Sequence, residues 1–249
     1  MMLRKTFFGA LIGVLSIGVV AAQQSPLLQV ARVLVKPDRV GEYIDIVKQL
    51  NEGAQKANSP TGVTAYRGVA GNPYEFVFIS PAGGYGEFDE TAAWIKSMPM
   101  DMRTRGTQLL ARRNQSVESV RVTYERGLTD LSIGETALRP KMLRMTRVHV
   151  RPGMADSFLA LVKADLVPAY KKANVARFRV RRVEYGGSRN DITLSAGIDK
   201  MGDLDLNLLA KVMGPDAAKK YLEKAAQMVS NSEYLVFRRV SDLSYEGKQ

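Results

Sequence analysis

The sequence repeats itself at an offset of 115 residues, and this repetition constrains the fold more than any other feature. Shifting the chain by this amount aligns residues 32–37 (RVLVKP) with 147–152 (RVHVRP), Tyr43 with Phe158, and Gly71 with Gly186. After a slip of three residues, the stretch 128–132 (LTDLS) aligns with 240–244 (VSDLS). An offset kept over about 85 positions indicates a tandem duplication. The chain is therefore expected to fold as two copies of one unit, joined around residues 134–140.

The first 22 residues are expected to be removed before the chain folds. Arg4 and Lys5 form a positively charged start, and residues 7–20 form an apolar run that ends at two alanines. This pattern is typical of a secretory signal peptide, because a membrane-spanning helix needs about 20 apolar residues. We predict a signal peptide (1–22), repeat 1 (23–137) and repeat 2 (138–249). The mature protein would be periplasmic or secreted, and an uncleaved N-terminal anchor is the alternative.

Each repeat has the same order of predicted elements. In repeat 1 these are a strand at 32–36, a helix opened by Pro37, strands at 62–69 and 74–80, a helical region at 92–113 broken near Pro99, and a strand at 117–126. In repeat 2 the second helical region covers 206–229 with a break near Gly214, and the last strand covers 234–240. The order β-α-β-β-α-β is that of a ferredoxin-like unit. The fold class is therefore α+β.

Two such units in tandem resemble the dimeric α+β barrel superfamily, which includes antibiotic-biosynthesis monooxygenases, NIPSNAP-type proteins and chlorite dismutases. The resemblance rests on element order and duplication, so it carries over no catalytic residue. It implies that the two antiparallel sheets face each other as a pseudo-dimeric barrel, with helices outside and a cleft between the sheets. Members bind hydrophobic ligands or haem, so the fold alone does not identify a function.

Alternation along the strands predicts which side chains line the cleft. Val33 and Val35, and their equivalents Val148 and Val150, are expected to pack on the helices, which leaves Arg147 and His149 facing the cleft. Alternation along the two middle strands of each repeat predicts an aromatic cleft wall in repeat 1 and a cationic cleft wall in repeat 2. The predicted ligand-binding residues are Tyr66, Phe76, Phe78, Arg147, His149, Arg179, Arg181, Thr193 and Ser195, with Thr64, Ser80 and Asp191 on the same faces.

The charge distribution supports an anion-binding cleft. The chain has 36 basic and 25 acidic residues, and repeat 2 alone has 21 basic and 12 acidic residues, while repeat 1 has 13 of each. Arginine suits carboxylate and phosphate groups because its guanidinium can bind them through two parallel hydrogen bonds. The alternative is a solvated sheet whose arginines pair with Asp191, Glu184 and loop carboxylates. Export makes nucleic acid an unexpected partner, whereas an anionic envelope surface is compatible with it.

His149 is the only histidine, and its role stays open among three alternatives. It can be a hydrogen-bonded cleft residue, a general base, or a haem ligand, because imidazole titrates near neutrality and coordinates iron. A metal site is not expected, since the sequence has no cysteine and only one histidine. We predict no cofactor, with haem as the alternative.

The main functional hypothesis is an exported binding protein for a small amphiphilic anion held between the two repeats. One alternative is a cofactor-independent oxygenase-like enzyme that uses the same cleft, with His149 as base. Another is a structural envelope protein whose cleft is filled by its own side chains. No catalytic motif is present, so the sequence leaves open whether the protein is an enzyme and which ligand it binds.

Overall fold

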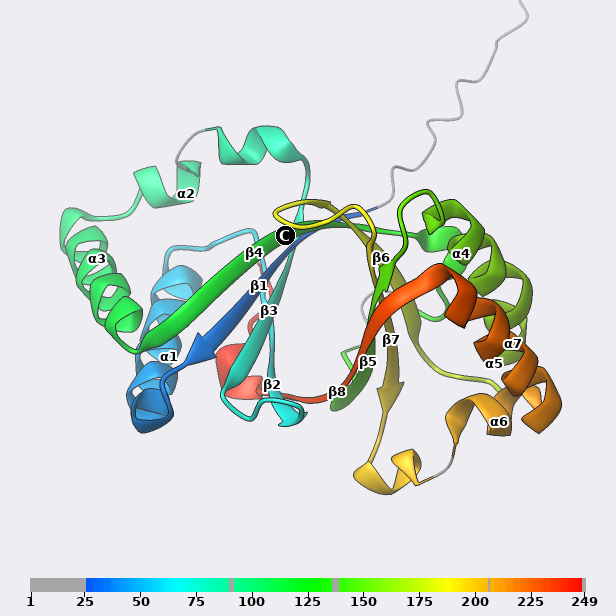
Figure 1. Ribbon diagram of the computed structural model, residues 1–249. Helices are drawn as coiled ribbons and strands as arrows, with labels where there is room; N and C mark the ends of the chain where they lie inside the picture. Colours follow the sequence, from blue (N-terminus) through cyan, green and yellow to red (C-terminus); the bar gives the residue numbers. More distant parts are fainter. Residues whose placement is uncertain (1–25, 90–91, 136–138, 206, 248–249) are drawn as a thin grey trace, which may run out of the picture.

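The computed structural model describes residues 26–89, 92–135, 139–205 and 207–247. In this part of the chain, antiparallel strands close into one barrel in the order β1-β3-β2-β8-β5-β7-β6-β4 (Figure 1). Their bounds are β1 Leu27–Val35, β2 Thr64–Ala70, β3 Glu75–Ala82, β4 Val117–Gly127, β5 Met142–Val150, β6 Phe178–Tyr185, β7 Asp191–Ile198 and β8 Val229–Arg239. The expected tandem ferredoxin-like barrel is thus confirmed.

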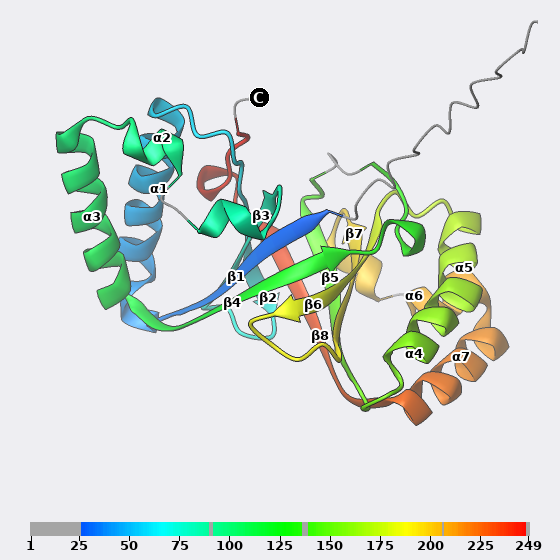
Figure 2. The same ribbon diagram turned by 90° about the horizontal axis from the view of Figure 1, so that it is seen from above.

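The helices lie outside the barrel, those of repeat 1 on one side and those of repeat 2 on the other (Figure 2). They are α1 Val40–Lys56, α2 Ala93–Lys96, α3 Met100–Gln115, α4 Ala155–Leu161, α5 Val167–Lys172, α6 Leu208–Met213 and α7 Pro215–Met228, with a π-helical turn Val162–Leu166 between α4 and α5. The predicted breaks are observed: Pro99 separates α2 from α3, and Gly214 separates α6 from α7. No described helix is long and apolar enough to cross a membrane. The predicted signal peptide lies outside the described residues.

Each repeat has its own hydrophobic core between its sheet and its helices. Val33 and Val35 pack against Tyr43 of α1 in repeat 1, and Val148 and Val150 pack against Phe158 of α4 in repeat 2. This confirms the predicted outer faces of the first strand in each repeat. The opposite faces of these strands therefore point into the barrel, where any ligand between the repeats would lie.

The two repeats exchange short segments that follow their last strands. The 3-10 turn Thr129–Leu131 of repeat 1 inserts Leu131 into the core of repeat 2, and the turn Ser241–Leu243 inserts Leu243 into the core of repeat 1. Hydrogen bonds accompany each exchange: Ala65 N donates to Ser244 Oγ (2.9 Å), and Val180 N donates to Ser132 Oγ (3.2 Å). The repeats are therefore interlocked as well as joined through the barrel.

The hairpin of repeat 2 is one residue longer than that of repeat 1. Tyr66 pairs with Val77 in repeat 1, whereas Arg181 pairs with Thr193 in repeat 2, so the offset is 115 before the turn and 116 after it. A slip of one residue exchanges the two faces of a strand. The predicted inward positions of Phe76, Phe78 and Ser80 are therefore wrong. Val77 and Ile79 face the barrel interior, and Phe76 and Phe78 pack in the helix-side core, where the Phe76 ring lies 5.2 Å from that of Tyr43.

Candidate functional site

The side chains that point into the barrel leave two cavities. One has a volume of about 490 Å³ and contains His149 in its lining; we call it the histidine cavity. The other has a volume of about 300 Å³ and lies where the linker residues Gly134 and Arg139 meet the start of β1; we call it the linker cavity. Arg181 lines both cavities. The barrel is therefore not filled by its own side chains.

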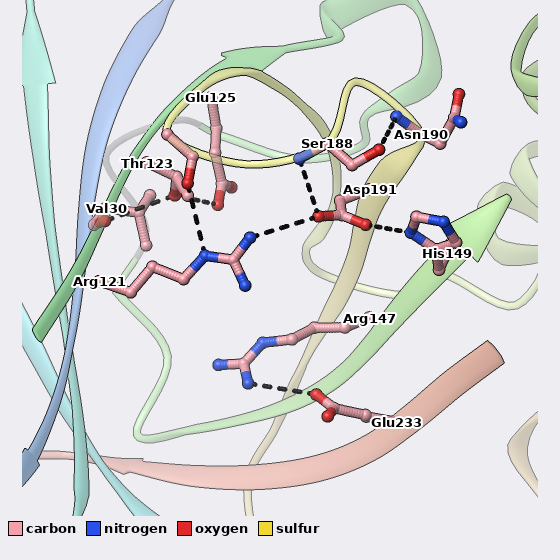
Figure 3. Close-up of polar contacts among 11 residues, drawn as sticks. Val30, Arg121, Thr123, Glu125, Arg147, His149, Ser188, Asn190, Asp191 and Glu233 are labelled. Atoms are coloured by element: carbon pink, nitrogen blue, oxygen red, sulfur yellow. Dashed lines mark hydrogen bonds and ion pairs between the residues drawn. The ribbon is translucent and has the colours of Figure 1, made fainter. Parts of the chain in front are cut away.

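His149 and Asp191 form a close pair in the histidine cavity (Figure 3). They are register partners on β5 and β7, and the distance from His149 Nδ1 to Asp191 Oδ1 is 2.6 Å. The other carboxylate oxygen, Asp191 Oδ2, accepts a hydrogen bond from Ser188 N (3.3 Å) and lies 3.8 Å from Arg121 Nη2. A carboxylate only accepts hydrogen bonds, so in the neutral imidazole Nδ1 carries the proton and Nε2 has the lone pair. The His149 side chain is 43% exposed and lines the histidine cavity, so the ring can meet a ligand there.

Two arginines at equivalent positions in the two repeats line the same cavity and share one carboxylate. Arg32 Nε and Arg147 Nη2 each donate to Glu75 Oε1 at 3.0 Å, and Arg147 Nη1 donates to Glu233 at 3.4 Å. The Arg147 guanidinium also lies over the Phe237 ring, 5.7 Å from its centroid. Burial, together with the charge of Arg32, lowers the pKa of Arg147, and Glu75 opposes this shift. Carboxylates thus hold both arginine side chains in place in the lining that also contains His149.

A buried ion pair separates the two cavities. Arg181 Nε lies 3.4 Å from Glu125 Oε2, and the side chains are 5% and 7% exposed. The other carboxylate oxygen of Glu125 accepts a hydrogen bond from Thr123 Oγ1 (3.0 Å). Neither Arg181 Nε nor Glu125 Oε2 has a hydrogen bond with good geometry among the described residues. The contact between Arg181 Nε and Glu125 Oε2 is therefore a charge attraction without a well-aligned hydrogen bond.

The predicted site residues divide between the two cavities. Arg147, His149 and Thr193 line the histidine cavity, whereas Tyr66, Arg179 and Ser195 line the linker cavity. Phe76 and Phe78 line neither. Sequence reasoning missed Glu75, Arg121, Glu125 and Arg177. The parity of β4, the last strand of repeat 1, could have indicated Arg121 and Glu125, whereas Glu75 begins β3, whose run of apolar residues gives no parity. Arg177 precedes β6, so strand alternation gives no signal for it.

The residues do not fit haem, the alternative cofactor. An apolar groove of about 490 Å³ lies between the sheet and the helices of repeat 2, but among its lining residues the only side chains able to act as an axial ligand are Tyr170, Tyr221 and Tyr234. Burial raises the pKa of the Tyr170 and Tyr221 phenols, which opposes the tyrosinate form that binds iron, and Tyr234 is 69% exposed. His149 lies instead in the charged histidine cavity, which is unsuited to a large apolar macrocycle. No cluster of three or more metal-binding side chains occurs in the described ranges.

Known proteins match this chain in structure but not in sequence. No family model matches the sequence, and no curated protein matches it. The structure resembles a protein of Fusobacterium nucleatum described as a candidate monooxygenase (TM-score 0.62, 12% identity, covering 90% of this chain and 99% of that one). It also resembles an anthrone oxidase-like protein (TM-score 0.62, 13% identity, 91% and 95%) and the chlorite dismutase of Candidatus Nitrospira defluvii (0.53, 10%, 88% and 93%). At these identities the likeness establishes the dimeric α+β barrel fold.

Proposed function

We propose that the protein is a cofactor-independent oxygenase-like enzyme whose active site is the histidine cavity. The observation that carries the proposal is the 2.6 Å contact between His149 Nδ1 and Asp191 Oδ1 at a cavity that also holds Arg147. A carboxylate that fixes the tautomer and orientation of an imidazole is the arrangement of a general base. The structural neighbours described as monooxygenase or anthrone oxidase-like support the same reaction class.

The proposed reaction begins with loss of a proton from an acidic C–H bond of an aromatic ketone or phenol. His149 Nε2 takes the proton, and the negative charge that develops on the substrate oxygen faces Arg147 and Arg121. Dioxygen then oxidises the carbanion and forms a C–O bond. The O–O bond of the resulting hydroperoxide breaks as the carbon loses its second proton. In total a CH₂ group and O₂ become a C=O group and water.

The anion-binding hypothesis is retained in one respect: the substrate is an anion in its reactive form. A binding protein needs the arginines but has no use for an oriented base. The volume of about 490 Å³ lies in the range of small-molecule sites, roughly 300–1,000 Å³. We also propose that the chain is exported, on the pattern of residues 1–22 described above.

The test is oxygen consumption with anthrone and related acidic C–H substrates. His149→Ala should lower kcat/KM at least about 100-fold, the usual contribution of a general base, and added imidazole should restore part of the activity. Asp191→Asn should lower kcat with KM unchanged, because it acts through His149. Tyr221→Phe, in the outer groove, is the matched control. Full activity in folded His149→Ala would refute the proposal, and wild-type protein that takes up no oxygen with any of these substrates would also contradict it.

A further inference from the structure

The linker cavity is distinct from the proposed active site in place and in charge. Among the described lining residues it shares only Arg181 with the histidine cavity, and its apolar floor is formed by Leu28, Ile79 and Leu143. Hydroxyl groups of Thr64, Tyr66, Thr129, Ser132 and Ser195 occur around this floor. A cavity with an apolar floor and a few polar groups is the usual form of a small-molecule site.

Positive charge in the linker cavity is not balanced by carboxylates in its lining. The arginines that line it are Arg139, Arg177, Arg179 and Arg181, and none of the described lining residues is Asp or Glu. The histidine cavity differs, since Glu125, Asp191 and Glu233 line it together with its arginines. Arg181 is paired with Glu125 and Arg179 donates to backbone oxygens, so Arg177 carries the buried charge that an anion in this cavity would balance.

One of these arginines has a buried donor without a partner. Arg177 Nε is inaccessible to solvent and has no hydrogen-bond partner among the described residues, whereas the equally buried Arg181 Nε lies 3.4 Å from Glu125 Oε2. Burial, with smaller contributions from the charges of Arg179 and Arg181, lowers the pKa of Arg177 to about 10. A buried donor without a partner is unfavourable, so a ligand that accepts from it gains affinity.

The other polar groups have different roles. Arg179 donates to the backbone oxygens of Ile133 and Phe178, and its Nη2 donates to Gly134 O at 2.9 Å, so it anchors the linker. Arg179 therefore adds positive charge to the cavity, but its Nη1 and Nη2 groups already donate to the backbone. Tyr66 is buried, and this burial raises the pKa of its phenol, which stays protonated and can donate a hydrogen bond.

We propose that the linker cavity is a second binding site, which takes a small amphiphilic oxyanion. Arg177 and Arg181 hold the carboxylate, sulfate or phosphate head, and the apolar body lies on Leu28, Ile79 and Leu143. The volume of about 300 Å³ limits the ligand to a short aliphatic chain or a single aromatic ring. The site is independent of the reaction at His149, so it can exist whether or not the protein is an enzyme.

The test is calorimetric titration and thermal shift of the full mature chain with octanoate, phenyl phosphate, inorganic phosphate and neutral octanamide, in low salt to limit screening. Octanoate or phenyl phosphate should bind and raise the melting temperature, and octanamide should do neither. Arg177→Gln should weaken oxyanion binding at least tenfold and raise the melting temperature of the ligand-free protein, because it removes an unbalanced charge. Arg121→Gln, in the histidine cavity, should leave this binding unchanged.

Several results would overturn the proposal. One is the absence of binding by either amphiphilic anion. A second is equal affinity of wild type and folded Arg177→Gln, and a third is equal loss of affinity in Arg121→Gln. Inorganic phosphate binding as tightly as phenyl phosphate would refute the role of the apolar floor. Activity measurements on Arg177→Gln separate this site from the active site, since oxygen consumption should persist in that variant.

Discussion

Leu131 and Leu243 occupy the same position in the two repeats, and each is buried in the hydrophobic core of the other repeat. The exchange is reinforced by matching hydrogen bonds: Leu128 N donates to Val180 O, and Val240 N donates to Ala65 O, both at 2.9 Å. Each core is thus completed by a residue from the far end of the other repeat. The two repeats should therefore unfold together, and the barrel cavities between them are held by both cores.

Truncating either leucine should weaken the opposite repeat. Leu243→Ala is expected to lower the free energy of unfolding by about 2–5 kcal/mol, the usual cost of removing a buried leucine side chain. Hydrogen exchange should show the largest loss of protection in α1, because the Leu243 side chain belongs to the core that contains Tyr43 and Val47 of this helix. Leu131→Ala should instead affect α4 and α5.

The control for these variants is Leu222→Ala on α7, since Leu222 is 44% exposed. It should change stability by no more than about 1 kcal/mol. If Leu243→Ala lowered protection in repeat 2 and left α1 unchanged, the exchange would not have the energetic role argued above.

The sequence predicted the fold because the duplication shows both repeats at once. The prediction of which β3 side chains face the barrel was wrong for a physical reason. Residues 76–79 (FVFI) are all apolar, as expected for a strand covered on both faces. Alternation gives no parity in such a strand, so the extra residue in the second hairpin was invisible. The site was predicted in part. Arg147 and His149 lie on an alternating strand, but the pairing of His149 with Asp191 depends on register between strands.

The Arg126–Glu184 pair gives a prediction about pH. Arg126 Nη2 donates to Glu184 Oε2 at 2.9 Å across the junction of β4 and β6, and the Tyr85 hydroxyl donates to the same oxygen. The hydrogen bond from Arg126 is the main cause that lowers the pKa of Glu184 in the folded state below 4.5. A lowered folded pKa gives stability that is present above the unfolded pKa and is lost as pH falls through the folded one.

Glu184→Gln should therefore cost about 1–2 kcal/mol at neutral pH, and the difference from wild type should shrink below pH of about 4.5. Urea unfolding at a series of pH values measures this difference. Asp156→Asn is the control, because Asp156 is almost fully exposed although it pairs with Arg182 at 3.2 Å. A Glu184→Gln deficit that stays constant down to pH 3 would contradict the assignment.

Export predicts a defined N-terminus. Protein recovered from its own host should begin at Gln23, because the apolar run ends at small residues that suit signal peptidase. Ala22→Arg should block cleavage and leave a longer precursor. N-terminal sequencing of both proteins distinguishes the outcomes, and Met1 retained in the wild type would instead indicate an uncleaved anchor.

The last prediction concerns the turn that places Asp191. Gly186 has φ of +79°, and a Cβ at this position would lie 2.1 Å from the carbonyl oxygen of Val122 on β4. Gly186→Ala must therefore move the hairpin away from β4, in addition to straining the backbone, and should cost more than about 2 kcal/mol. Gly153 is the matched control, because its φ is +80° but a Cβ there would have open space within 4 Å. Gly153→Ala should show the strain alone, about 1 kcal/mol.

Movement of the hairpin would also displace Asp191 from His149, so Gly186→Ala should lower kcat while Gly153→Ala leaves it unchanged. Equal effects of the two variants on stability and on kcat would show that the contact with Val122 does not position this pair.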